Sequence, residues 1–156
     1  MSENKVVSEI NAVSSDPSTV KRILFNALDH FSRYGYTGAS VREITHASQV
    51  TKPTLYYYFK NKEELYTKLS QSCFEEILGR IQSAVDRPGT TRVRVLNLIK
   101  EYCLLCEERR SVARFVHLMS LLPDRTTPDV GAVAFNMKLG DFFRQILTDG
   151  VELYAA

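Results

Sequence analysis

With 156 residues, 44% of them hydrophobic, the chain can form one domain of ordinary size or a small head on a larger body. Its apolar runs are too short for a membrane span and its polar N-terminus has no signal peptide, so we expect a cytoplasmic protein with no membrane partner. The net charge of +2 conceals a net of +4 in residues 17–70, where eight basic residues stand against four acidic ones. That excess suits phosphate contacts, although a solvated helical face could show it too.

Helical spacing of apolar residues recurs along the chain and strand signals are almost absent, so the predicted fold class is all-α. The first helix is expected to begin at Asp16 and Pro17, an N-cap residue followed by proline at the first helical position. One apolar stripe then extends to Phe31, and Gly35 is expected to end the helix. Residues 1–16 are predicted to form a flexible N-terminal tail.

Two brief helices joined by a tight turn are predicted next. Ser40 and Glu43 match a capping box at the start of the first, and Thr51 caps the second, which carries Pro53 in its first turn. The apolar residues expected to pack inward are Ile44, Ala47, Val50, Leu55 and Phe59. This is the pattern of a helix-turn-helix, whose second helix enters the major groove of DNA by its N-terminal end.

Packing those side chains inward leaves a polar set facing outward. Its members are Thr51, Lys52, Thr54, Tyr56 and Tyr57. Lys52 can donate to guanine, Pro53 and the Thr54 methyl can touch a thymine methyl, and the hydroxyls can reach phosphates. Arg42 on the preceding helix can contact a base edge or a phosphate, and Lys62 can hold the DNA backbone. The alternatives are core aromatic residues for the tyrosines and solvated charges for Arg42 and Lys62.

The rest of the chain is predicted to form a helical body. A long helix capped by Asn61 should extend to the Arg-Pro-Gly sequence at residues 87–89. Three further helices are expected at residues 91–108, 111–122 and 130–153, with a loop over residues 123–128. The chain would thus divide into a DNA-binding helix-turn-helix head over residues 17–60 and a ligand-binding and dimerisation body over residues 61–156.

The segment TKPTLYYYFKNK at residues 51–62, followed by Glu-Glu-Leu65, resembles the signature of the TetR family of helix-turn-helix regulators. Residues 31–38 and 40–44 fit the same family pattern, and the resemblance covers about residues 20–69. It implies a transcriptional repressor that binds a double-stranded, palindromic DNA operator as a homodimer and is released by a small-molecule effector.

Individual roles follow from the resemblance. It implies base or thymine-methyl contacts for Arg42, Lys52, Pro53, Tyr56 and Tyr57. It implies phosphate contacts for Ser40, Thr54, Tyr58 and Lys62. Two positions depart from the family pattern: Gln49 stands where a glycine with positive φ is usual, at a cost of about 1 kcal/mol, and Tyr58 stands where tyrosine and histidine alternate.

The body is also expected to depart from the family pattern, by lacking the last helices, which form the dimer interface in the family. An effector pocket is nevertheless expected in it, for an apolar or aromatic molecule. Its candidate lining residues are Tyr102, Cys103, Cys106, Phe115, His117, Leu118, Met119, Phe135, Met137 and Phe143. A solid core built from these same residues is an equal alternative.

Two other functions stay open at this point. The chain could be a truncated helical protein that pairs with another regulator, or Cys103 and Cys106 could sense oxidation, although a core role fits these cysteines better. No set of four metal ligands is visible, and we expect no cofactor. Catalytic motifs such as a Gly-x-Ser-x-Gly elbow or a phosphate-binding glycine loop are missing, so we do not expect an enzyme.

Overall fold

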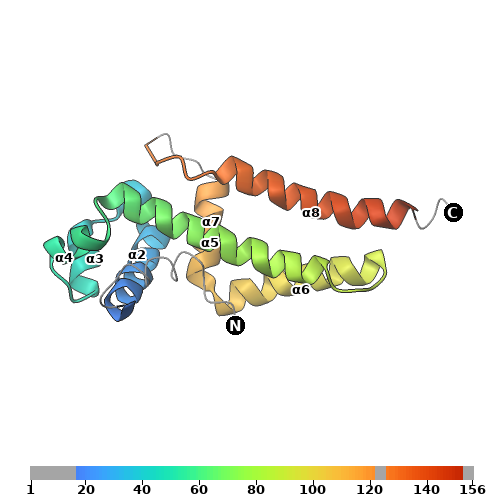
Figure 1. Ribbon diagram of the computed structural model, residues 1–156, viewed down its shortest axis with the longest axis horizontal. Helices are drawn as coiled ribbons and strands as arrows, with labels where there is room; N and C mark the ends of the chain where they lie inside the picture. Colours follow the sequence, from blue (N-terminus) through green and yellow to red (C-terminus); the bar gives the residue numbers. More distant parts are fainter. Residues whose placement is uncertain (1–16, 122–125, 153–156) are drawn as a thin grey trace.

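A computed structural model describes residues 17–121 and 126–152 of the chain (Figure 1). Across these ranges the secondary structure is entirely helical, which confirms the predicted all-α class. The helices are α2 (Pro17–Gly38), α3 (Val41–Ala47), α4 (Lys52–Tyr58), α5 (Lys62–Val85), α6 (Thr91–Glu108), α7 (Arg110–Leu121) and α8 (Ala132–Glu152). None of the helices in the described ranges is long and apolar enough to cross a bilayer.

The helices form a small head at one end of a long body. Helices α2, α3 and α4 make the head, and α5 leads away from it through the middle of the molecule (Figure 1). Helices α6 and α8 pack along α5, while α7 packs against α2 and so joins the head to the body. The body helices begin and end within two residues of the predicted positions. Residues 1–16 and part of the predicted loop, residues 122–125, lie outside the described residues.

Helix α2 forms because one face carries apolar residues at helical spacing. Val20, Ile23 and Phe31 on that face are completely buried. Gly35 interrupts the helix with φ +68° and ψ −176°, and the chain then makes one more helical turn to Gly38. Gly35 therefore ends the regular first part of the helix, as expected, but residues 36–38 add a helical turn after it.

One continuous hydrophobic core connects the head to the body. At its centre the Phe31 ring stacks against Phe115 of α7, with 6.2 Å between the ring centroids. Tyr66 of α5 meets both rings edge-on, at 5.0 Å from Phe31 and 5.3 Å from Phe115. Burial raises the pKa of Tyr66 to about 12, so its hydroxyl stays neutral. Aromatic residues of the head and of the body therefore form one cluster.

Candidate nucleic-acid interface and body cavity

Helices α3 and α4 pack on α2 through a few large apolar side chains. Ile44, Leu55 and Phe59 are completely buried, and Val50 is half-buried. Ala47, predicted to face inward, is exposed. Ser48 takes the inward position, because it lies one turn after Ile44 and its small hydroxyl donates to the backbone oxygen of Arg22 at 3.4 Å.

The predicted capping box at the start of α3 does not form. Ser40 is the N-cap residue of α3, but its side chain makes no capping hydrogen bond. Glu43 instead lies near α2, with its Oε2 atom 3.8 Å from Nδ1 of His30. The Glu43 carboxylate thus lies toward α2, beyond hydrogen-bond distance of His30, and the Ser40 hydroxyl makes no capping bond to the helix that it starts.

The turn between the two short helices has the predicted left-handed residue. Gln49 has φ +54°, and its N–H donates to the backbone oxygen of His46 at 3.1 Å. The N–H of Val50 donates to the oxygen of Thr45 at 3.0 Å. These bonds hold the turn in a conformation that an L-residue adopts only with strain.

Replacing Gln49 with glycine should therefore stabilise the protein. Relief of the left-handed conformation gains about 1–2 kcal/mol, and the greater freedom of the unfolded chain offsets about 0.5–1 kcal/mol of it. Urea unfolding should show the net gain as a higher midpoint at an unchanged slope. The matched control is Gln71→Gly at an exposed position inside α5, which should lose about 1 kcal/mol. A loss of stability in Gln49→Gly would contradict the backbone strain inferred at Gln49.

Helix α4 presents its first turn to solvent. Thr51 caps it, with its hydroxyl oxygen accepting from the N–H of Thr54 at 3.2 Å, and the two threonine hydroxyls lie 2.8 Å apart. Lys52 and Pro53 follow, both exposed. Leu55 is the only residue of α4 that is buried. The other side chains of its first turn can therefore contact a binding partner.

Two tyrosines extend this exposed surface. Tyr56 is 43% exposed and Tyr57 is 73% exposed, values that exclude the core role considered for both. Arg42 on α3 is exposed as well. We call the outward surface of α3 and α4 the reading face, and its members are Arg42, Lys52, Pro53, Tyr56 and Tyr57.

The two remaining phosphate candidates, Tyr58 and Lys62, are less exposed than the reading face. Tyr58 is half-buried, with its ring edge-on to that of Tyr57 at 5.0 Å. Lys62, in the first turn of α5, places its Nζ atom 4.6 Å from the centre of the Tyr36 ring. Removal from water lowers the pKa of Lys62. Both side chains are half-buried, so they are less open to a phosphate than the members of the reading face.

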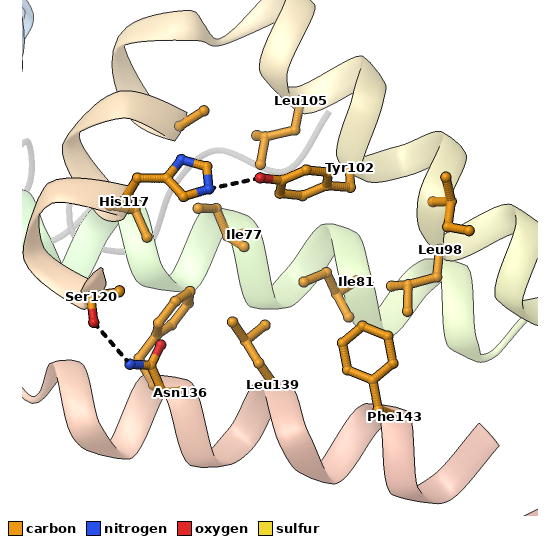
Figure 2. A pocket seen from close by; sticks show the side chains of 14 residues that line it. Ile77, Ile81, Leu98, Tyr102, Leu105, His117, Ser120, Asn136, Leu139 and Phe143 are labelled. Carbon is orange, nitrogen blue, oxygen red and sulfur yellow. Dashed lines mark hydrogen bonds between the residues drawn. The ribbon is translucent and has the colours of Figure 1, made fainter. Parts of the chain in front are cut away.

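A cavity of about 400 Å³ lies in the body between α5, α6, α7 and α8 (Figure 2). Its walls are almost wholly apolar. The lining residues are Ile77, Ile81, Leu98, Ile99, Tyr102, Leu105, Ala113, Val116, His117, Ser120, Phe135, Asn136, Leu139 and Phe143. Four residues predicted for an effector pocket, Tyr102, His117, Phe135 and Phe143, are thus brought together.

The other six candidates do not line this cavity. Phe115 and Met119 lie on the opposite face of α7, where Phe115 packs on the head and the Met119 sulfur accepts from the Ser70 hydroxyl at 3.1 Å. Met137 is 68% exposed on the outside of α8. Cys103 is exposed and Cys106 is half-buried on α6, and Leu118 is half-buried on α7. These six residues were predicted from their apolar character alone, without knowledge of the helix face on which each one lies.

Of the polar residues in the cavity wall, Tyr102 and His117 were predicted from the sequence, and Ser120 and Asn136 were missed. The Tyr102 hydroxyl lies 2.7 Å from Nε2 of His117 (Figure 2). Asn136 on α8 donates from Nδ2 to the backbone oxygen of Ser120 at 3.4 Å. The spacing of Ala113, His117 and Ser120 along one face of α7 was a signal that could have found Ser120.

The three cysteines should differ in reactivity, because only a thiolate reacts quickly. Cys73 is buried, and burial raises the pKa of its thiol to about 12. In native buffer near pH 8 we expect Ellman's reagent to modify Cys103 first and Cys106 more slowly, while Cys73 reacts only after unfolding. Cys103→Ser should remove the fast phase alone. Reaction of three thiols at one rate in native buffer would contradict this expectation.

Comparison with known proteins bears on the head first. The family model for bacterial regulatory proteins of the tetR family matches residues 23–69. IcaR of Staphylococcus epidermidis, a negative transcriptional regulator of the biofilm operon icaADBC, is 40% identical over 53 residues, 34% of this chain and 29% of IcaR. IcaR of Staphylococcus aureus strain Newman is 26% identical over 88 residues, 56% of this chain and 47% of its own length. The chain thus spans less than half the length of these curated relatives.

Solved structures resemble the whole fold. PfmR of Thermus thermophilus, a TetR family transcriptional regulator, superposes with a TM-score of 0.69 at 21% identity, over 86% of this chain and 73% of PfmR. FadR of Bacillus subtilis, a transcriptional regulator solved in complex with stearoyl-CoA, gives a TM-score of 0.66 at 19% identity, over 85% of this chain and 71% of FadR. At these identities the likeness concerns the fold alone.

Proposed function

Because residues 23–69 match the model of the tetR family of bacterial regulatory proteins, we propose that this chain is a transcriptional repressor of that family. In this proposal the reading face binds a palindromic operator in double-stranded DNA, and a small molecule in the body cavity releases the protein from it. The two halves of the proposal rest on different parts of the structure and can be tested separately.

The reading face is the observation that carries the proposal. A short helix that buries one residue and exposes a lysine, a proline and two tyrosines has little reason to exist in a head without a partner. Lys52 and Arg42 supply donors for guanine or phosphate, and the tyrosines supply hydroxyls and apolar surface. The net charge of +4 over residues 17–70 favours approach to a polyanion.

Operator binding by a symmetric site calls for two heads about one DNA turn apart, and α8 supports pairing of two chains. Val133, Met137 and Leu147 are spaced along this helix and are 76%, 68% and 58% exposed. Gly140 and the charged Arg144 lie between them on the same side, so these side chains form an interrupted apolar stripe that a second helix can cover. We propose that this stripe takes part in a homodimer.

Release by an effector needs a path from the cavity to the reading face. Helix α7 supports one, because Ala113, Val116 and His117 line the cavity while Phe115, on the other side, packs against the head. Helix α5 supports a second, because it lines the cavity with Ile77 and begins shortly after α4. A ligand that binds one position of these helices more tightly shifts the population between DNA-competent and incompetent states. FadR of Bacillus subtilis, with its stearoyl-CoA, is a case of ligand binding in this fold.

The test is sedimentation of the purified protein, alone and with DNA from beside its own gene, at about 50 and 200 mM salt. The proposal expects a dimer that prefers this DNA to unrelated DNA, with an affinity that falls by about 10³-fold or more across that range if six or more phosphates are neutralised. A monomer with weak, unselective binding would overturn it.

The same apolar stripe on α8 favours a second function, pairing with another regulator. In that case the chain would occupy one position of a mixed dimer and alter the operator affinity of its partner. Sedimentation separates the two ideas, because a stable homodimer at micromolar concentration leaves the stripe covered and removes the reason for a mixed pair.

A further inference from the structure

The ammonium group of Lys62 is held by an aromatic ring. Its Nζ atom lies 4.6 Å from the centre of the Tyr36 ring, and among the residues that the structure describes it forms no ion pair with a carboxylate. Lys68, six residues further along α5, instead pairs with Glu64 at 2.9 Å. A ring anchors a cation without cancelling its charge, whereas a carboxylate cancels it. The charge of Lys62 is therefore available to an anion.

The Tyr36 ring is fixed by the aromatic cluster of the core. It lies edge-on to Tyr66, with 4.9 Å between the ring centroids, and it stacks with Phe31 at 6.3 Å. Tyr66 comes one helical turn after Lys62, so the ring covers one face of the first turn of α5. Gly35, with φ +68°, bends α2 immediately before this ring. Residues of α2 and of α5 thus hold the surface on which Lys62 lies.

The hydroxyl of Tyr36 stays neutral at ordinary pH. Burial, together with the negative charge of Glu63, raises the pKa of Tyr36. A neutral ring offers its negative face to the ammonium group and adds no formal charge that would repel a phosphate. Lys60 and Lys62 stand against Glu63 here, so this end of α5 retains a positive balance.

We infer that the Tyr36 ring positions the Lys62 ammonium group to bind a phosphate of the DNA backbone, beside the groove that the reading face enters. This inference rests on the proposed binding of DNA and deepens it. Lys62 follows Tyr58, the last residue of α4, by four positions. A lysine side chain loses rotamer freedom when it is fixed on a phosphate, and the ring imposes part of that loss in advance. Tyr36 is thus a positioning residue that acts on DNA through Lys62.

The salt dependence of binding tests the phosphate contact. Fluorescence anisotropy measures the affinity for two labelled duplexes, DNA from beside the gene and unrelated DNA of equal length, because both present phosphates. Lys62→Ala should weaken binding to both about five- to tenfold, and it should lower the slope of log affinity against log salt by about 0.9 for each bound head. Lys68→Ala is the matched control, since its charge is already paired, and it should change the slope little. An unchanged slope in Lys62→Ala would overturn the contact.

Variants of Tyr36 test the positioning. Tyr36→Leu should weaken binding about two- to fivefold and lower the slope as well, whereas Tyr36→Phe retains the ring and should bind like the unmodified chain. In a chain that already carries Lys62→Ala, Tyr36→Leu should cause no further loss, because the two residues act as a unit. Additive losses would overturn the positioning role. So would tighter binding by Tyr36→Leu, or an equal loss in Tyr36→Phe, which would make the hydroxyl the contacting group.

Tyr34→Leu is the matched control for the change of an aromatic residue on α2. Tyr34 is 57% exposed, and its ring lies 5.9 Å from that of His30. This variant should leave the salt slope unchanged, and any effect that it has on affinity should add to that of Lys62→Ala. Coupling of Tyr34→Leu to Lys62→Ala as strong as that of Tyr36→Leu would overturn the specific role of Tyr36.

The position of Lys62 can also be measured without DNA. Protons above an aromatic ring resonate upfield because of the ring current, so the Hε protons of Lys62 should show an upfield NMR shift that Tyr36→Leu removes and Tyr36→Phe retains. Absence of this shift would overturn the inference whatever the DNA results.

The outcomes separate the inference from the proposed function. Equal affinity for the two duplexes, with the expected slopes, would contradict operator binding and leave the inference standing. A preference for DNA from beside the gene, with slopes that no variant changes, would do the reverse. Failure to bind either duplex would overturn both.

Discussion

Replacement of Arg42 and Lys52 by alanine should weaken the proposed operator binding by roughly 100-fold or more while leaving the fold intact. Both side chains are exposed on the reading face, so their loss creates no cavity in the core. A well-made contact to a base edge discriminates by about 1–3 kcal/mol, so the pair should cost roughly 100-fold or more in affinity. Fluorescence anisotropy with labelled DNA from beside the gene, at one fixed salt concentration, measures the loss.

A matched control separates specific contacts from general charge. Arg92→Ala with Lys100→Ala removes the same two charges from exposed positions on α6 in the body, and it should weaken binding little. The reading face would be misassigned if the two double variants lost affinity equally, or if the Arg42 and Lys52 variant bound as tightly as the unmodified protein. Circular dichroism of both variants should match that of the parent chain.

Replacement of Phe115 by alanine should be the most destabilising change described for this chain. The side chain is 1% exposed and packs between Phe31 and Tyr66, in contact with both the head and the body. Truncation of a buried phenylalanine costs about 3–5 kcal/mol, because lost burial and a residual cavity add together. The melting temperature should fall by roughly 6–20 °C for a protein of this size.

Phe25→Ala is the matched control for that change. This phenylalanine is also on a helix, α2, but 73% of its surface is exposed, so the same truncation should alter the free energy of unfolding by less than about 0.5 kcal/mol. If Phe115→Ala melted like Phe25→Ala, the aromatic cluster would not join the two parts of the molecule.

Local sequence signals predicted much of the head. Thr51 followed by Pro53 marks the beginning of α4 by capping and by a fixed φ, effects that act within one helical turn. Gln49 was expected in a left-handed conformation, and it has one. These features were predictable because their physical causes involve neighbours in the sequence.

Errors arose where contacts with residues distant in the sequence decide the position of a side chain. Glu43 could cap α3 as part of a capping box, but it lies toward α2, 3.8 Å from Nδ1 of His30. Ala47 has the apolar character expected of an inward residue, but the neighbouring Ser48 fits the small space against α2 and is buried in its place. In a helix of seven residues a shift of one position decides which side chain packs.

The cavity shows the same limit on a larger scale. Phe115 and His117 are two residues apart on α7, so they lie on different faces, and only the packing of α2 on one side reveals which face borders the cavity. Ser120 and Asn136 were missed because a serine and an asparagine on amphipathic helices are ordinary surface residues in sequence. Their place in the cavity wall depends on how α8 packs against α7.

The aromatic cluster that links α2, α5 and α7 also limits how such a regulator can be recombined. A head transplanted onto an unrelated helical body would leave Phe31 facing a surface without partners for its ring, and the chimera would fold poorly whatever its affinity for DNA. Under the proposed function, new combinations of operator and ligand would then arise by substitution on the reading face and in the cavity wall, with the aromatic cluster retained. Exchange of those side chains would then be the practical way to retarget the protein.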